Sequence, residues 1–179
     1  MKKNLFMRIP VLRALLLVLV SMGCETNDLD KTISREAAEQ MAVSQLKRGY
    51  IVGVAQEVDL GRQVFKIFVQ NESAAVRVMV DVATGRLIEV KDATDEYQEA
   101  LAKGESVLEP VSLSHRDAAE FAALSAMPGA VRKWRVLMDE SGRMIFRFNI
   151  VSARDQERRV TIDARSQEVL EVAEVENKS

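Results

Sequence analysis

The chain contains few of the residue types that catalytic sites need. His115 is its only histidine and Cys24 its only cysteine. The chain therefore lacks the His and Cys residues needed for several kinds of site: Ser-His-Asp and Cys-His nucleophile systems, histidine-rich zinc sites and thiol-redox pairs. A carboxylate pair of the glycosidase type stays open, because Asp and Glu are plentiful. We expect no catalytic residue, no cofactor and no metal site, and we predict that the protein is not an enzyme.

Cys24 follows a segment with the three parts of an export signal. Basic residues lie near the N-terminus, apolar residues fill 14–20, and small residues occupy 21–23. The apolar run is shorter than the roughly 20 residues that cross a bilayer. This arrangement resembles the signal of bacterial lipoproteins, in which the cysteine after the cleavage site receives a lipid. The resemblance implies a signal peptide over 1–23 and a lipid anchor on Cys24; a secreted protein with a free thiol is the alternative.

Removal of the signal peptide changes the charge of the chain. Four basic residues and no acidic residue leave, so 21 Lys and Arg remain against 27 Asp and Glu, a net charge of −6. Nucleic-acid binders need a basic face, so we expect no nucleic-acid partner. Glu25 rather than Asp follows Cys24. By resemblance to Gram-negative lipoproteins, this residue implies the periplasmic face of the outer membrane.

The remainder of the chain repeats itself after about 80 positions. Residues 34–42 match 114–122 at an offset of 80, and residues 81–88 match 163–170 at an offset of 82. We interpret this pattern as an internal duplication. Each copy predicts one helix followed by four short strands.

Helix signals open both copies. In the first, Ser34 is a suitable N-cap and Gly49 a stop signal, which predicts a helix of about 14 residues. In the second, Ser114 and Asp117 have capping-box spacing, and Pro128 ends the helix. Helical spacing predicts these apolar faces: Ala38, Met41, Ala42 and Leu46 in the first helix, and Ala118, Phe121, Ala122 and Ser125 in the second.

After each helix the apolar residues alternate with polar ones, which is typical of strands with one buried face. The predicted strands are 51–58, 63–69, 75–82 and 86–90 in the first copy, and 131–138, 144–151, 157–163 and 168–172 in the second. Tight turns between them favour antiparallel pairing. The predicted fold class is α+β, with two repeats that each pack one helix on a small antiparallel sheet of three to four strands.

These elements divide the chain into segments. A flexible tether over 24–32 precedes the first domain (33–91), and a tail (174–179) follows the second domain (113–173). The connector 92–112 contains a helix signal from Thr94 to Gly104. It is also rich in acidic residues.

Two motifs frame the first copy. An Ile-Ser pair at 33–34 precedes the alanine-rich helix, and Val-x-Val-Asp-x-x-Thr-Gly-x-Leu occupies 78–87. They resemble the motifs of the PepSY domain, a module of thermolysin-type protease propeptides and of bacterial envelope proteins. The second copy matches less closely, at 113–114 and 160–169. The resemblance implies a non-catalytic regulatory or inhibitory module, in which a helix packs across a small antiparallel sheet.

The closing motif predicts a structural turn rather than a ligand site. Asp81 can accept hydrogen bonds from the amides that follow it, near Thr84, and Gly85 adopts positive φ at little cost. Asp163 takes the place of Asp81 in the second copy, but Gln167 replaces the glycine. That turn must either change type or place Gln167 in a left-handed conformation, at roughly 1 kcal/mol or more.

Four residues of the second copy are candidates for partner binding. Arg154, Arg158 and Arg159 lie around its third strand and could receive an acidic partner or an anionic lipid headgroup. Charges on a solvated sheet edge are the simpler interpretation. Trp134 lies in the first strand among basic residues, either as a core residue or as an anchor for a partner.

Our hypothesis is a non-catalytic, lipid-anchored envelope protein whose tandem PepSY-like domains bind or inhibit another envelope protein, with a protease as one candidate. An exposed sheet edge would make strand addition the natural binding mode. The alternative is a sensor or binding protein for a small ligand or peptidoglycan fragment in the cleft between the domains. A deep polar pocket there would favour the sensor. An unpaired edge strand, or an apolar patch around Trp134, would favour the protein binder.

Overall fold

The computed structural model describes residues 32–175. The predicted signal peptide, Cys24 and residues 176–179 lie outside this part of the chain. Within it, no helix is long and apolar enough to cross a membrane.

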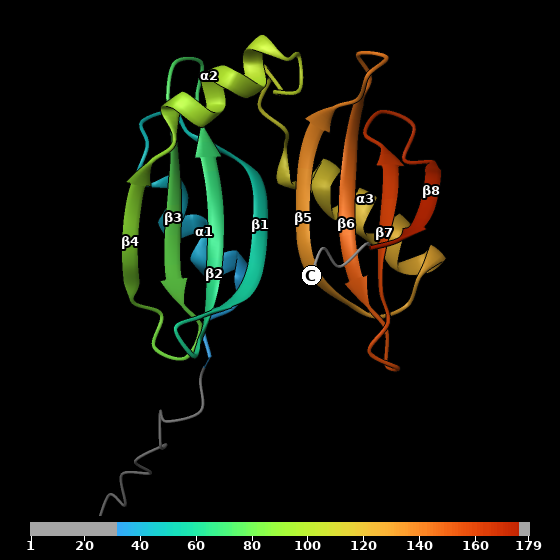
Figure 1. The fold of residues 1–179 in the computed structure, drawn as a ribbon, viewed down its shortest axis with the longest axis horizontal. Helices are drawn as coiled ribbons and strands as arrows, with labels where there is room; N and C mark the ends of the chain where they lie inside the picture. Colours follow the sequence, from blue (N-terminus) through green and yellow to red (C-terminus); the bar gives the residue numbers. More distant parts are fainter. Residues whose placement is uncertain (1–31, 176–179) are drawn as a thin grey trace, which may run out of the picture.

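Eight strands form one antiparallel sheet (Figure 1). They are β1 (Tyr50–Asp59), β2 (Arg62–Gln70), β3 (Ala75–Asp81), β4 (Leu87–Asp92), β5 (Ala130–Met138), β6 (Met144–Val151), β7 (Glu157–Asp163) and β8 (Val169–Glu174). Their order across the sheet is β4-β3-β2-β1-β5-β6-β7-β8. The prediction of two separate repeats, each with a small sheet of its own, is therefore wrong, because the two groups of four strands are continuous.

The two groups join where β1 pairs with β5. The paired residues are Gly53 with Arg135, Val54 with Trp134, and Ala55 with Lys133. A Cβ atom on Gly53 would lie 3.0 Å from the Trp134 carbonyl oxygen and 3.2 Å from the Arg135 Cβ. The strands can approach this closely because Gly53 has no side chain. Turn signals predict pairing only between consecutive strands, so this long-range pairing was not predicted.

Helices α1 (Arg35–Val43) and α3 (Leu113–Ala126) cover one face of the sheet (Figure 1). Helix α1 begins after Ser34, whose side chain accepts a hydrogen bond from the Ala37 amide at 3.2 Å. It ends at Val43, earlier than predicted, and turns follow up to Arg48. Of the helices within residues 32–175, α1 and α3 share this face, and the third helix lies at one end of the sheet (Figure 1).

Helix α3 differs from the prediction in its N-cap and in its buried face. Its N-cap is Ser112 rather than Ser114. Its buried residues are Arg116, Ala119 and Ala123. Phe121, which we placed on the apolar face, is 75% exposed. The prediction from apolar spacing left Arg116 on the surface. Because Arg116 is buried, the inner face of the helix is rotated about the helix axis relative to the predicted face.

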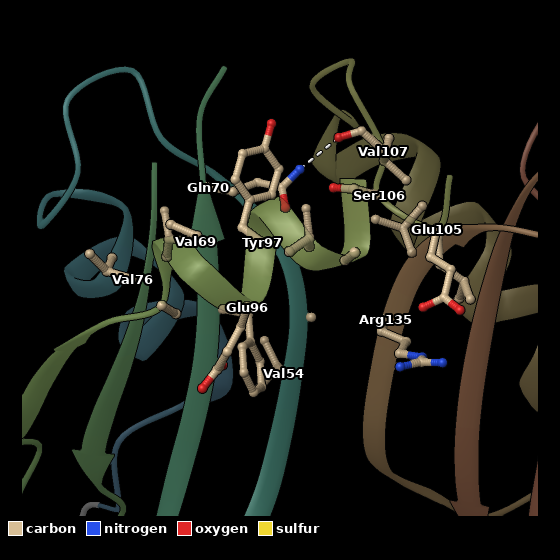
Figure 2. A pocket seen from close by; sticks show the side chains of 18 of the residues that line it. Val54, Val69, Gln70, Val76, Glu96, Tyr97, Glu105, Ser106, Val107 and Arg135 are labelled. Atoms are coloured by element: carbon tan, nitrogen blue, oxygen red, sulfur yellow. Dashed lines mark hydrogen bonds between the residues drawn. The ribbon is translucent and has the colours of Figure 1, made fainter. Parts of the chain in front are cut away.

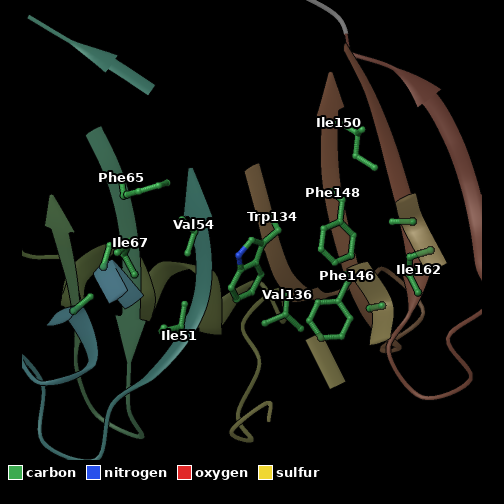
Figure 3. Packing of buried hydrophobic residues seen from close by; sticks show 14 of the residues in the cluster. Ile51, Val54, Phe65, Ile67, Trp134, Val136, Phe146, Phe148, Ile150 and Ile162 are labelled. Atoms are coloured by element: carbon green, nitrogen blue, oxygen red, sulfur yellow. The ribbon is translucent and has the colours of Figure 1, made fainter. Parts of the chain in front are cut away.

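One hydrophobic core runs beneath both helices. Buried residues of the first four strands and of the last four belong to a single cluster, as Figure 3 shows around Val54 and Trp134. The Trp134 ring lies 6.5 Å from the ring of Phe146, which stacks on Phe148 at 6.0 Å. The core therefore crosses the junction between β1 and β5 without a break.

Helix α2 (Thr94–Ala102) lies at one end of the sheet, within the predicted connector (Figure 1). Tyr97 is buried against Ala75 and Ala93, at the end of β3. Thr94 does not cap the helix. Its hydroxyl instead lies 3.3 Å from the Ala75 amide, which ties the start of α2 to the sheet.

The close approach at Gly53 gives a prediction about stability. Glycine to alanine in a compatible backbone conformation stabilises a protein by about 0.4–1 kcal/mol. At Gly53 we expect the opposite sign, a loss of about 1–3 kcal/mol for Gly53→Ala, because the new methyl group presses on β5. Urea unfolding measures the difference. A variant as stable as the parent chain, or more stable, would contradict the close packing of β1 on β5.

Candidate functional site

The four predicted partner-binding residues do not form one surface. Trp134 is 2% exposed and belongs to the core. Arg154 is exposed in the turn between β6 and β7. Arg158 and Arg159 are consecutive residues of β7, so their side chains point to opposite faces of the sheet. The sequence left Trp134 open as a core residue or as an anchor for a partner, and in the structure it is a core residue.

Trp134 lies beside a buried ion pair that links α1 to α3. The Arg116 guanidinium lies 5.3 Å from the centre of the Trp134 ring. Arg116 Nη1 donates to Glu39 Oε1 at 2.8 Å, and both side chains are 3% exposed. Burial raises the pKa of the Glu39 carboxyl, and the charges of Arg116 and Arg35 oppose this rise. Neither residue stands out in the sequence among the many charges of the two helices, so the pair was not predicted.

A second ion pair lies beside the first and joins the same two helices. Arg35 Nη2 lies 2.9 Å from Glu120 Oε2, and Arg35 Nε lies 3.7 Å from Glu39 Oε1. Both side chains are largely covered. Four charged residues thus fasten α1 to α3 across the line where β1 meets β5. We assign them a structural role, because each cation lies beside a carboxylate of the other helix.

Within residues 32–175, no further strand pairs with either outer strand of the sheet. In this part of the chain, β4 pairs with β3 alone, and β8 pairs with β7 alone. Every residue of β4 is exposed, and β8 is exposed except at Ala173. Six apolar side chains lie on these strands, each about 40% exposed: Leu87, Ile88, Val90, Val169, Leu170 and Val172. Both edges therefore combine unpaired backbone groups with apolar side chains.

A cavity of about 320 Å³ lies beneath α2, at the junction of the two groups of strands (Figure 2). Its walls come from β1, β2, β3, β5, α2 and the segment 105–107. Most of the lining is apolar, including Val54, Val69 and Tyr97. Gln70 Nε2 donates to the Val107 carbonyl oxygen at 2.6 Å and closes one side. Glu96 and Arg135 supply charged groups to the lining.

The two closing turns have the same geometry. Asp81 Oδ1 accepts from the Thr84 amide at 2.7 Å, and Gly85 has a φ of 66°. Asp163 Oδ1 accepts from the Ser166 amide at 2.8 Å, and Gln167 has a φ of 63°. The second turn therefore keeps its type and bears a left-handed non-glycine residue. Backbone hydrogen bonds lower the pKa of both aspartates.

No metal site is visible in the described part of the chain, since residues 32–175 contain no group of three or more His, Cys, Asp or Glu residues placed to hold an ion. His115 lies exposed in the first turn of α3. Its Nδ1 lies 3.0 Å from Ser112 Oγ, next to the helix cap.

Comparisons with known proteins show similarity of fold. No protein-family model matches the chain, and no curated protein matches it in sequence. The fold is similar to the crystal structure of a candidate lipoprotein from Clostridium difficile 630, with a TM-score of 0.54 and 19% sequence identity. The similarity covers 83% of this chain and 97% of the other. At this identity it shows the fold alone, so the PepSY resemblance rests on the sequence motifs.

The ion pair between the helices gives a second prediction. Arg116→Met leaves the Glu39 carboxylate buried without its nearest cation, so we expect a loss of about 3–5 kcal/mol. Glu39→Leu combined with Arg116→Met removes both charges from the core, and we expect a smaller loss. Urea unfolding at neutral pH measures each variant.

Asp117→Ala is the matched control for this experiment. Asp117 also contacts Arg116, with its carboxylate 2.6 Å from Arg116 Nε, but it is mostly exposed. Exposed pairs contribute about 0–1 kcal/mol, so the control should stay close to the parent chain. A loss in the double variant that equals or exceeds the loss in Arg116→Met would show that the two charges do not act as a pair.

Proposed function

We propose that this chain is a non-catalytic, lipid-anchored envelope protein that binds an extended segment of another envelope protein at an edge of its sheet. The observation that carries the proposal is the pair of uncovered edge strands, β4 and β8. An added strand would pair with their free backbone groups. It would also rest on apolar side chains that are otherwise in water.

Exposed edge strands are normally protected against such pairing. Short length, charges and covering elements are the usual means. Here β4 carries Glu89 and Lys91, yet all six of its residues are exposed in the described part of the chain, and three of them are apolar. β8 has the same mixture, with Glu171 between Leu170 and Val172. Edges of this kind suit a partner segment that has an apolar side chain at every second position.

The anchor and the location rest on the N-terminal residues. Cys24 follows an export-like segment and a small-residue cleavage site. The Clostridium difficile protein with a similar fold is itself a candidate lipoprotein, which agrees with an envelope location. Because Glu25 rather than Asp follows Cys24, we propose the periplasmic face of the outer membrane as the more specific location.

The partner class follows from the motifs at 33–34 and 78–87. Their resemblance to PepSY modules makes an envelope protease the first partner to test, with inhibition as the effect of binding. An extended inhibitory segment and an extended substrate both present strand-like backbone, which suits pairing at an edge.

The cavity beneath α2 supports a second candidate function. It lies at the junction between the two groups of strands, where the sensor hypothesis places a small ligand. Its volume of about 320 Å³ falls at the lower end of the roughly 300–1,000 Å³ of small-molecule sites. Its lining is mostly apolar, so a compact apolar ligand fits it better than a peptidoglycan fragment.

Substitutions at the edges test the protein-binding function. Val90→Lys on β4 and Val172→Lys on β8 add a charge where a new strand would pack, and the exposure of both residues should keep the fold intact. Crosslinking in the native envelope, followed by mass spectrometry, should recover one partner strongly from the parent chain and weakly from one of these variants.

Val58→Lys is the matched control for the edge variants. Val58 is also an exposed valine, but it lies near the β1–β2 turn and away from both edges. Equal recovery of the partner from all three variants would exclude edge binding. Recovery of no partner from the parent chain would direct attention to a small ligand in the cavity.

Substitution of Cys24 tests the anchor separately. Cys24→Ser cannot be acylated, so we expect the protein to move from the membrane fraction to the soluble fraction of the envelope. Detergent phase partition followed by immunoblotting measures the change, and mass spectrometry of the N-terminal peptide identifies the lipid. A parent chain that is already in the soluble fraction would contradict lipid anchoring.

A further inference from the structure

The open face of the sheet contains a hollow that is lined almost entirely by cations. Its volume is about 190 Å³, and its lining residues are Lys133, Arg135, Arg147, Asn149 and Arg159. They come from three neighbouring strands, β5, β6 and β7. Helices α1 and α3 lie on the other face of the sheet (Figure 1), and no residue of any helix in the described part of the chain lines this hollow.

The register of the strands brings these charges together. Arg135 pairs directly with Arg147, and Asn149 pairs with both Lys133 and Arg159. Side chains of directly paired residues share one face, with Cβ atoms about 4.5–5.5 Å apart. Like charges in this arrangement destabilise a sheet. Repulsion within the cluster therefore destabilises the folded protein, and a bound anion would remove this repulsion.

Carboxylates within residues 32–175 form no ion pair with the cluster. Among residues 32–175, the ion pairs within 4.0 Å involve other cations than these four. Glu157 contacts the neutral residue of the lining, since its Oε1 accepts from Asn149 Nδ2 at 2.8 Å. Burial and the charges of Arg147 and Arg159 lower the pKa of Arg135, which Glu105 only partly offsets. The positive charge is thus left for a ligand.

The neighbouring strand leaves room above the cluster. On β1, Gly53 lies opposite Arg135 and Ala55 lies opposite Lys133. Neither residue has a side chain long enough to reach across the open face, so a group that approaches from solvent meets the cations first. Guanidinium groups can bind phosphate oxygens through two parallel hydrogen bonds, and Lys adds a point charge.

We propose that this hollow is a binding site for a phosphate-class oxyanion, held by Arg135 and Arg147 together with Lys133 and Arg159. Four cations match a group that carries more than one negative charge. The hollow is smaller than the roughly 300–1,000 Å³ of sites that enclose a whole small molecule, so it holds the anionic end of a ligand. That group is either the phosphate of a soluble molecule or the phosphate of a lipid headgroup.

Inorganic phosphate, acetate and lipid vesicles are the probes that test this site. Isothermal titration of the chain should show binding of phosphate and weaker binding of acetate, and phosphate should raise the melting temperature. Arg135→Gln with Arg147→Gln should weaken phosphate binding by about tenfold or more, because charge-assisted hydrogen bonds are lost. The variant should fold at least as stably as the parent chain, since the repulsion between paired arginines is removed.

A variant with the same change in charge is the control. Arg86→Gln with Lys91→Gln removes two exposed cations from the other end of the sheet, outside the hollow. It should bind phosphate as the parent chain does. Equal losses in the two double variants, or equal binding in all three proteins, would overturn the proposal, because either result means general attraction between charges.

Vesicles distinguish the two sources of the anion. Lipid-free protein is mixed with phosphatidylcholine vesicles, with and without phosphatidylglycerol, and sedimented. Binding to the anionic vesicles that the Arg135 and Arg147 variant loses would support the site with a lipid headgroup as its ligand. Binding of phosphate without binding of vesicles would support the site with a soluble ligand. Binding of neither phosphate nor anionic vesicles would overturn the proposal.

Discussion

The pairing of β1 with β5 is the constraint on which the rest of the structure depends. It joins two groups of four strands into one sheet, and it does so through a short run of residues centred on Val54 and Trp134. Because the two groups share this junction, they also share one core and one set of helix contacts. The cavity beneath α2 and the basic hollow both border the same junction, so its geometry shapes each candidate binding site.

The two faces of the sheet use charge in opposite ways. On the covered face, Glu39 and Arg116 meet in the interior, so their charges are matched and hold α1 to α3. On the open face, Arg135 and Arg147 meet without a matching carboxylate in the described chain. Buried pairs of the first kind contribute to a unique arrangement of helices, whereas unmatched cations of the second kind are typical of sites that bind anions.

The sequence predicted local structure better than long-range structure. Alternating residues such as Val76, Val78 and Val80 are enough to place a strand, because the period of two reflects a local property of the backbone. Gly53 gave no such signal, since its importance comes from β5, which lies far along the chain. The phase of α3 was missed for a similar reason, because Arg116 is buried only through its contacts with Glu39 and Trp134. The basic hollow was partly visible as Lys133 and Arg135, but only the strand register adds Arg147.

The two uncovered edges have a consequence for how many partners the protein can hold. β4 and β8 end the same sheet on opposite sides, and they expose apolar side chains to nearly the same degree. Neighbouring strands lie about 4.8 Å apart, so strands added at both edges would be separated by roughly 40 Å. Under the proposed edge binding, such a protein would be bivalent and would bridge two chains or two sites of one assembly. Engagement of both edges at once would then give avidity, in which two weak contacts act as one strong attachment.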